Sequence, residues 1–238
     1  MKKIIQLFAI VIICLALASC GGSSNNKQDG NSSKIGQNEV SSNSDIKITK
    51  EEILSSFIKD QDGNQYKIVT LGKQVWMAEN LNVSHYRNGD EIPQVQDPSK
   101  WKYLTTGAWC YYENNSENER KYGKLYNWYA VNDSRGLSPE GWHIPSDQDW
   151  TELAMYLGGS ELAGDRMKDS HEFNVAYGGF VFRTGEFAGL DVIGGWWSTL
   201  QNNHTIYCRA VNKNEKQLIR SSENSDFENG ISVRCIKK

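Results

Sequence analysis

The clearest periodic pattern of apolar residues lies in the middle of the chain. Four apolar side chains recur there at helical spacing: Trp150, Leu153, Ala154 and Leu157. Positions i, i+3, i+4 and i+7 share one face of an α-helix, so the pattern predicts an amphipathic helix. Ser146 stands at the expected N-cap, Asp149 takes the matching capping-box position, and the glycine pair 158–159 ends the helix.

A shorter helix and an extended segment precede this helix. Three residues fall on one helical face: Leu125, Trp128 and Tyr129. Their spacing predicts a short helix that ends near Asn132. Residues 142–145 are expected to be extended, because Pro145 disfavours helical backbone in the residue before it. The stretch 122–157 is therefore the expected centre of the fold.

Strand patterns occupy much of the remaining chain. Residues 66–71 and 74–77 flank Gly72 and Lys73, a pair that suits a two-residue hairpin turn. Further β-rich segments are 108–112, 177–182, 194–199, 205–211, 217–220 and 231–235. Residues 87–101 and 113–120 are polar and are expected to form loops. The whole pattern predicts an α+β domain with twisted antiparallel sheets and two short central helices.

The N-terminus has the pattern of an exported lipoprotein. Two lysines follow Met1, an apolar run spans residues 4–17, and Leu17-Ala18-Ser19-Cys20 closes it. The pattern predicts a signal peptide over residues 1–19, because the run is too short for a membrane span. The alternatives are an ordinary signal peptide that happens to end near a cysteine and a single anchor helix. The last four residues resemble a bacterial lipobox, which implies cleavage before Cys20 and lipidation of its sulfur. Gly21 carries no inner-membrane retention signal, so we expect the outer membrane, with the leaflet left open.

Composition changes sharply after the leader. Residues 20–45 are mostly Gly, Ser and Asn, which cannot bury enough surface to order themselves, so a flexible tether is expected. A capping-box pattern at Thr49 and Glu52 then predicts a short helix over residues 46–60. The domain itself is expected to span residues 61–238.

Charge and aromatic content restrict the classes of binding partner that the chain is expected to have. The formal net charge is -3, and no block of Lys or Arg stands out. Such a chain lacks the basic surface of a nucleic-acid binder. Aromatic residues make up 11%, which favours a rigid core or a stacking surface. The expected partners are the membrane, through the lipid, and a glycan or an envelope protein.

Six phrases along the chain resemble one known family. They are VWMAENL (75–81), CYY (110–112), YGKLY (122–126), GWHIP (141–145), WWS (196–198) and SVRC (232–235). In this order they closely resemble the Fibrobacter succinogenes major paralogous domain. The resemblance implies a C-type-lectin-like fold, similar to formylglycine-generating enzymes, in which the first and last strands pair. It carries over no established activity.

Three cysteines remain for the domain: Cys110, Cys208 and Cys235. An odd number in an exported protein implies at most one bridge and one leftover thiol. The resemblance favours Cys110–Cys235 as a disulfide, since family members often carry cysteines at those positions. Cys208–Cys235 is the alternative, and three buried thiols are the third. The closely spaced copper-binding cysteines of formylglycine-generating enzymes have no counterpart here.

No catalytic constellation is evident. The four histidines are His85, His143, His171 and His204, and none has metal-ligand spacing. No nucleophile elbow or phosphate loop is present. Asp147, Asp149 and Glu152 are better explained by capping and a solvated helix face. Paired carboxylates can meet in space and are left open. No cofactor is expected, and a structural calcium ion in an acidic loop is left open.

A binding surface is expected around the tryptophan pair. Neighbouring side chains on a strand point to opposite faces, so one of Trp196 and Trp197 can lie in the core while the other is exposed. The alternative is that both rings are packed under loops. Amide and imidazole groups follow at Asn202, Asn203 and His204, and an exposed ring beside them suits sugar stacking. Trp101 and Trp109 are weaker candidates for an exposed ring.

The sequence therefore favours a lipid-anchored cell-envelope protein whose lectin-like domain binds a glycan or a protein partner without catalysis. Two alternatives are kept. One is an envelope enzyme that acts on glycans, and the other is a structural or assembly lipoprotein.

Overall fold

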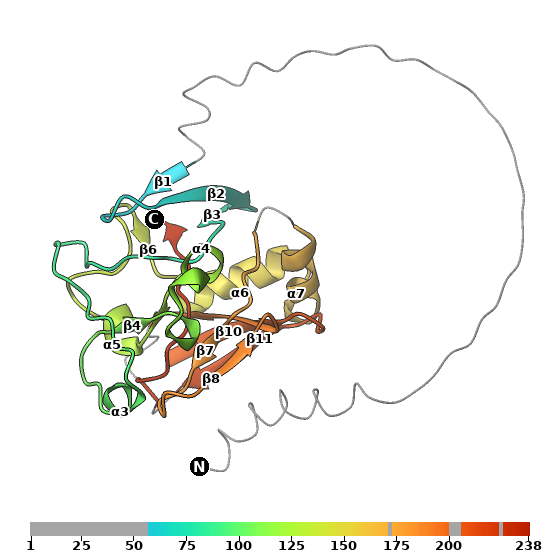
Figure 1. Ribbon diagram of the computed structural model, residues 1–238. Coiled ribbons are helices and arrows are strands. Elements are labelled where there is room, and N and C mark those ends of the chain that lie inside the picture. The colour runs from blue at the N-terminus through green and yellow to red at the C-terminus, as the bar shows by residue number, and fades with distance from the viewer. Residues whose placement is uncertain (1–56, 171–172, 200–205, 224–225) are drawn as a thin grey trace, which may run out of the picture. The chain divides into compact units, whose positions relative to one another are not determined.

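Strands from both ends of the described chain meet in one five-stranded antiparallel sheet (Figure 1). The computed structural model describes residues 57–170, 173–199, 206–223 and 226–238. In spatial order the strands are β1 (Phe57–Lys59), β2 (Gln65–Leu71), β3 (Gln74–Met77), β12 (Ile236–Lys237) and β6 (Trp142–His143). The hairpin of β2 and β3 turns at Gly72, as its sequence predicts. The pairing of β12 with β3 joins sequence-distant parts of the domain.

Three smaller sheets complete the strand content of the described residues. The three-stranded sheet has the order β11-β10-β9, with β9 (Ile193–Trp197), β10 (Ile206–Asn212) and β11 (Leu218–Glu223). Two pairs are β4 (Trp109–Cys110) with β5 (Leu125–Tyr126), and β7 (Gly178–Val181) with β8 (Phe187–Leu190). All strand pairings within these sheets are antiparallel. The α+β prediction is confirmed.

Two ten-residue helices are the longest in the described residues. They are α6 (Asp147–Tyr156) and α7 (Ser160–Asp169), which lie side by side in Figure 1. Short helices are α3 (Pro98–Trp101), α4 (Glu119–Tyr122) and α5 (Trp128–Val131), with 3₁₀ turns η1 (Tyr112–Asn114) and η2 (Ser116–Asn118). None of the helices in these ranges combines the length and apolar character that a membrane span requires.

The capping box predicted for α6 is present. The Ser146 hydroxyl accepts from the Asp149 amide at 3.1 Å, and the Asp149 carboxylate accepts from the Ser146 amide at 2.7 Å. Trp150, Leu153 and Ala154 are buried, as the apolar stripe predicts. The helix is therefore fixed at its start by local hydrogen bonds and along its inner face by burial.

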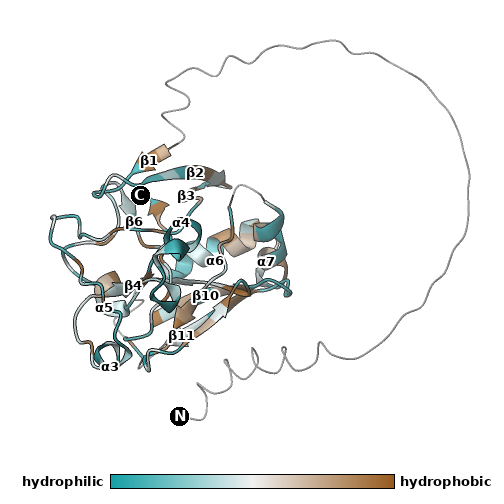
Figure 2. Cartoon of the chain, in the orientation of Figure 1, coloured by the Kyte–Doolittle hydropathy of each residue, from teal (hydrophilic) through white to brown (hydrophobic). Residues whose placement is uncertain are grey.

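An aromatic cluster joins the five-stranded sheet to the three-stranded sheet. The ring centroids of Trp76 and Trp150 lie 4.7 Å apart, and those of Trp150 and Trp196 lie 5.6 Å apart. Phe173 packs edge-on against Trp196 at 6.0 Å. These rings come from β3, α6, β9 and the segment before β7, so this core unites four parts of the chain. Apolar residues are prominent on β10 and β11, whereas α4 is hydrophilic (Figure 2).

Two of the predicted helices include residues that form strands in the structure. Residues 57–59, expected at the end of a helix over 46–60, form strand β1 and pair with β2. The remainder of that expected helix lies outside the described residues. Leu125 and Tyr126 form β5 instead of starting a helix, because they pair with Cys110 and Trp109. The helix begins only after Asn127, whose side chain accepts from the Ala130 amide.

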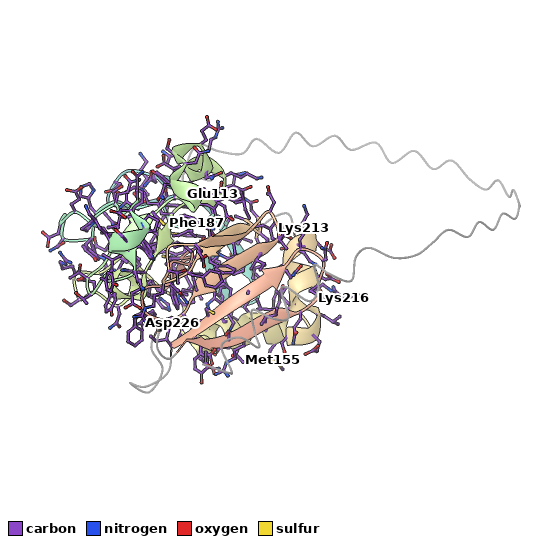
Figure 3. The ribbon with its side chains drawn as sticks, turned by 60° about the horizontal axis from the view of Figure 1, so that its bottom comes forward. Glu113, Met155, Phe187, Lys213, Lys216 and Asp226 are labelled. Carbon is purple, nitrogen blue, oxygen red and sulfur yellow. The ribbon has the colours of Figure 1, made fainter. Side chains whose placement is uncertain are left out.

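Helix α7 was not predicted, because Gly164 interrupts its pattern. A Cβ at this position would lie 2.6 Å from the carbonyl oxygens of Lys216 and Gln217. Lys216, labelled beside the helix in Figure 3, belongs to the turn between β10 and β11. The glycine therefore permits close approach of this turn to α7, and the helix is stabilised by packing rather than by its own propensity.

The last predicted strand is shorter than expected. Ile231, Val233 and Cys235 are buried as predicted, but the regular strand β12 covers only Ile236–Lys237. The preceding residues bond in turn to separate elements: the carbonyls of Ile231, Ser232, Val233 and Cys235 accept from the amides of Tyr126, Trp197, Leu81 and Met77. Residues 231–235 therefore cross from one sheet to the next and do not form one continuous strand.

Candidate functional site

The tryptophan pair on β9 lies in the core. Trp196 and Trp197 are both 0% exposed. The indole Nε1 of Trp196 donates to Asn80 Oδ1 at 2.8 Å, and that of Trp197 donates to the carbonyl oxygen of Tyr126 at 2.8 Å. Both ring nitrogens are thus satisfied inside the protein, and neither ring is available for sugar stacking.

The predicted exposure at this pair is wrong because both faces of β9 are covered. Trp150 packs on Trp196, and Trp128 packs on Trp197 with ring centroids 5.5 Å apart. The side chains do alternate between the two faces of β9, but this alternation does not indicate whether one face or both faces of the strand are buried. The other predicted members of this surface, Asn202, Asn203 and His204, lie outside the described residues.

The two weaker ring candidates are also buried. Trp101 is 2% exposed and Trp109 is 6% exposed. Their indole nitrogens donate to the carbonyl oxygens of Glu228 and Ile92 at 2.7 and 2.8 Å. Each ring therefore anchors a neighbouring loop.

The three cysteines of the domain lie in separate parts of the fold. Cys110 is in β4, Cys208 is in β10, and Cys235 immediately precedes β12, and all are buried. No disulfide joins them within the described residues, so neither Cys110–Cys235 nor Cys208–Cys235 is formed in this structure. Burial raises the pKa of the Cys110 and Cys235 thiols, which disfavours the reactive thiolate.

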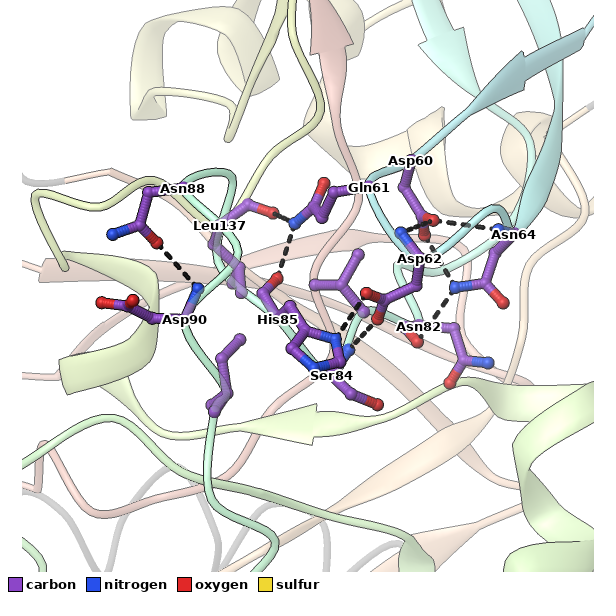
Figure 4. Close-up of polar contacts among 12 residues, drawn as sticks. Asp60, Gln61, Asp62, Asn64, Asn82, Ser84, His85, Asn88, Asp90 and Leu137 are labelled. Carbon is purple, nitrogen blue, oxygen red and sulfur yellow. Dashed lines mark hydrogen bonds and ion pairs between the residues drawn. The ribbon is translucent and has the colours of Figure 1, made fainter.

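Two histidines are held by carboxylates. His85 Nδ1 lies 2.7 Å from Asp62 Oδ1, and the Ser84 amide donates to the same carboxylate (Figure 4). His143 Nε2 lies 3.4 Å from Asp149 Oδ2 at the start of α6. Across the described ranges, no three His, Cys, Asp or Glu side chains gather in a way that could hold a metal ion.

A polar pocket of about 210 Å³ opens beside β3 and α4. Three of its walls are formed by Glu79, Asn80 and Asn82 after β3, by residues 119–123 of α4 and its C-cap, and by Asn174 and Ala176 before β7. Residues 64–66 at the start of β2 form the remaining wall. Its polar lining side chains are Asn64, Gln65, Tyr66, Glu79, Asn80, Asn82, Glu119, Arg120, Lys121, Tyr122 and Asn174. Carboxylates, amides and phenols thus converge on one small space.

The wall at Asn82 is held by hydrogen bonds from several directions. Its amide donates to the Tyr66 hydroxyl at 2.9 Å, and its side-chain nitrogen donates to Glu119 Oε1 at 2.9 Å. Its carbonyl oxygen accepts from Lys124 Nζ at 2.7 Å and from Asn64 Nδ2 at 3.3 Å, the latter drawn in Figure 4. These bonds fix Asn82 before any ligand arrives.

The floor of the pocket rests on a buried arginine. Arg234 is fully buried, and its guanidinium donates to Asn80 Oδ1 at 3.0 Å and to the carbonyls of Phe173 and Asn174. Asn80 in turn donates to the Tyr122 carbonyl at 2.9 Å. Arg234 therefore connects the three lining segments from behind.

Electrostatics give the pocket both signs of charge. Burial raises the pKa of Glu79, although the Lys67 amide donates to its carboxylate at 2.9 Å. Burial lowers the pKa of Lys124, which lies 4.0 Å from Glu119, and lowers the pKa of Arg234 to about 9. Two carboxylates, Glu79 and Glu119, thus line the pocket together with the cationic Arg120 and Lys121, and Lys124 and Arg234 lie behind them.

A second hollow, of about 360 Å³, lies between α6 and the hairpin of β2 and β3. Its outer wall is Met155 and Tyr156, which are 70% and 60% exposed. Met155 is labelled at the surface in Figure 3. The lining of this hollow combines these two side chains and Leu71 with the polar residues Lys73, Gln74, Gln148, Thr151 and Glu152.

The polar pocket was missed by sequence reasoning, although a signal was present. Two of the recognised phrases, 75–81 and 122–126, contribute residues to its lining, and they lie about 40 residues apart in the sequence. Their polar members Glu79 and Asn80 had no place in a strand pattern. Two polar residues directly after a buried strand could have indicated a site at the end of that strand.

Comparison with known proteins supports the resemblance. The chain matches the Fibrobacter succinogenes major domain over residues 69–237. No curated protein and no solved structure gave a significant match. The match includes the pocket walls after β3, at α4 and before β7, together with Arg234, whereas the wall at residues 64–66 precedes it. By this match, which spans well over half of the sequence, the chain belongs to the Fibrobacter succinogenes major domain family.

Proposed function

We propose that this protein is a lipid-anchored component of the bacterial cell envelope whose domain binds a glycan or a protein partner and catalyses no reaction. The polar pocket at β3 and α4 carries the proposal, because its walls are preorganised by hydrogen bonds. The leader and Cys20 support the anchor, and Gly21, where an inner-membrane retention signal would usually place Asp, supports the proposed outer-membrane location.

The proposed architecture is C-type-lectin-like. Its support is the meeting of the first hairpin with β12 in one sheet, together with short helices and long loops around the sheets. A fold of this kind presents ligands on its loops while the sheets hold them in place. The pocket lies in such a position, between a loop after β3 and a loop before β7.

Binding is tested with the full chain in detergent micelles on a glycan array and in pull-downs from solubilised envelope. We expect specific retention of a glycan or of an envelope protein. Glu119→Arg places a cation in the pocket and should abolish this retention. Met155→Arg in the second hollow serves as the matched control and should leave it intact. Absence of both glycan and protein binding would favour the structural or assembly role.

A glycan-cleaving enzyme is the second candidate, because Glu79 and Glu119 line the same pocket. Glycoside hydrolysis uses two carboxyl groups on either side of the scissile bond. Release of reducing ends from a bound glycan, lost in Glu79→Gln and in Glu119→Gln, would establish the enzyme. Binding without turnover would retain the non-catalytic proposal.

A further inference from the structure

Strand β2 is covered along only part of its outer edge. On one side β3 pairs with its last four residues, 68–71. On the other side β1 pairs only with residues 65–67 (Figure 1). Within the described residues, no strand pairs with residues 68–71 along this second edge. An open strand edge invites pairing with another strand, so natural proteins usually cover it.

The backbone groups of Thr70 lie at this open edge. Leu71 and Gln74 face each other across the two-residue hairpin turn, so their backbone groups bond to each other. Successive residues of an antiparallel strand direct these groups alternately to its two neighbours. The amide and carbonyl of Thr70 are therefore directed away from β3, and so are those of Ile68.

Apolar surface is exposed at the same end of β2. Leu71, Met155 and Tyr156 line the hollow between α6 and the hairpin, and the last two are 70% and 60% exposed. The Tyr156 ring rests on the hairpin turn, since a Cβ at Gly72 would lie 2.8 Å from its Cδ2. Exposed apolar side chains grouped beside an open strand edge indicate a surface that another segment covers.

The direction of β1 indicates which segment this is. β1 runs antiparallel to β2, with Phe57 opposite Lys67. The chain that enters β1 is therefore directed along the open edge from the hairpin turn. In the same register, residues 53–56 would fall opposite residues 71–68, so four residues match the length of the edge. Their sequence, Ile-Leu-Ser-Ser, contains neither Gly nor Pro, the strongest breakers of regular structure.

The register also assigns a face to each side chain. Val69 and Leu71 are buried in the core cluster that includes residues of α6. Residues that pair across antiparallel strands lie on the same face. Ile53 would thus lie beside Leu71 at the hollow, whereas Leu54 would lie beside Thr70 on the opposite face. An apolar side chain is therefore available for the apolar surface that is exposed there.

We propose that residues 53–56 extend β1 along the open edge of β2 and that Ile53 covers the hollow beside Met155 and Tyr156. The occupant is this chain's own segment, and strand replaces the C-terminal part of the helix expected over residues 46–60. The inference does not depend on the ligand of the polar pocket. It assigns the residues that follow the tether to the domain, as the strand that closes the sheet edge.

Disulfide trapping in the full chain in detergent micelles tests the register. Facing Cα atoms in a hydrogen-bonded antiparallel pair are about 5.5 Å apart, which suits a disulfide. Leu54→Cys with Thr70→Cys should therefore form a bridge within one chain on mild oxidation. Non-reduced tryptic mapping should find peptide 51–59 joined to peptide 68–73. Ser55→Cys with Thr70→Cys is the matched control and should not form the bridge, because the two side chains lie on opposite faces.

Amide hydrogen exchange, followed by NMR, tests the pairing without altering a paired residue. In the parent chain the Thr70 amide should exchange as slowly as the Val69 amide, which faces β3. Ile53→Asp should speed exchange at Thr70 by about tenfold or more, because the edge opens locally, and should leave Val69 unchanged. Glu51→Gln, outside the paired segment, serves as the control and should alter neither rate.

Three outcomes overturn the inference. Equal bridging in both cysteine pairs would show that the segment has no fixed register. Bridged dimers in place of bridged monomers would assign the edge to a second copy of the chain. Rapid exchange at Thr70 in the parent would show that the edge stays open, and this measurement decides the matter if a cysteine variant does not fold.

Discussion

The charged side chain of Asp147 is buried and paired with two arginines. Asp147 was expected to cap α6 or face solvent, yet it is 5% exposed. Arg220 donates to both of its carboxylate oxygens at 2.8 Å, and Arg209 donates to it from the buried side at 2.5 Å. The sequence could not show this, because both arginines lie more than 60 residues away.

Asp147→Asn should destabilise the domain by about 3 kcal/mol at pH 7, because it leaves buried Arg209 without its counter-ion. Burial opposes ionisation of Asp147, but hydrogen bonds and charge from the two arginines outweigh it and hold its pKa below the ordinary value. Its contribution is therefore complete above the unfolded pKa and is lost as pH falls through the folded pKa.

Urea unfolding at pH 7 and at pH 3 measures this difference. Glu152→Gln, on the exposed side of the same helix, serves as the control and should change little at either pH. An Asp147→Asn penalty that is as large in acid as at pH 7 would contradict an electrostatic origin.

The thiols of Cys110, Cys208 and Cys235 should react slowly in the folded protein because all three are buried. Burial also raises the pKa of the Cys110 and Cys235 thiols. A thiol-specific dye added at pH 8 to the unit of residues 49–238 should therefore report little reaction. In guanidinium the same dye should count three thiols, and a count of one would mean that two cysteines form a bridge.

At the scale of elements, local chemistry predicted α6 and the β2–β3 hairpin, and packing decided the rest. The cap at Ser146 and the turn at Gly72 depend on residues that are neighbours in sequence. Helix α7 depends instead on a distant turn that approaches Gly164. The same holds for the pocket, whose walls come from distant segments that are joined by the bonds of Asn80 and Asn82 and by Arg234. The spacing of apolar residues along the sequence cannot reveal contacts between such distant segments.

Ser146→Ala should lower the free energy of unfolding by about 1 kcal/mol, because the α6 capping box loses its side-chain acceptor. Thermal unfolding followed by circular dichroism measures the loss. Gln148→Ala removes an exposed side chain from the same turn and should stay within about 0.5 kcal/mol of the parent. Equal melting temperatures for Ser146→Ala and the parent would show that packing alone fixes the helix start.

At the scale of the whole molecule, the proposed lipid anchor at Cys20 is open to a direct test. Cys20→Ser should leave an unprocessed precursor that incorporates no labelled fatty acid, because the lipidated sulfur is removed. Metabolic labelling and the gel mobility of the full chain measure this outcome. Normal labelling of Cys20→Ser would refute the anchor. Cys14→Ser, within the leader, is the matched control and should be processed and labelled as the parent is.

The position of β12 has a consequence for biogenesis. This strand fills the gap between β3 and β6, so the central sheet stays open until residues 236–237 have been synthesised. Pairings that join such distant residues form slowly, because a long loop must close first. A nascent chain that lacks this strand cannot complete its tertiary structure. Delayed closure of this kind would suit the proposed export, because a secretion channel accepts a polypeptide that has not yet folded.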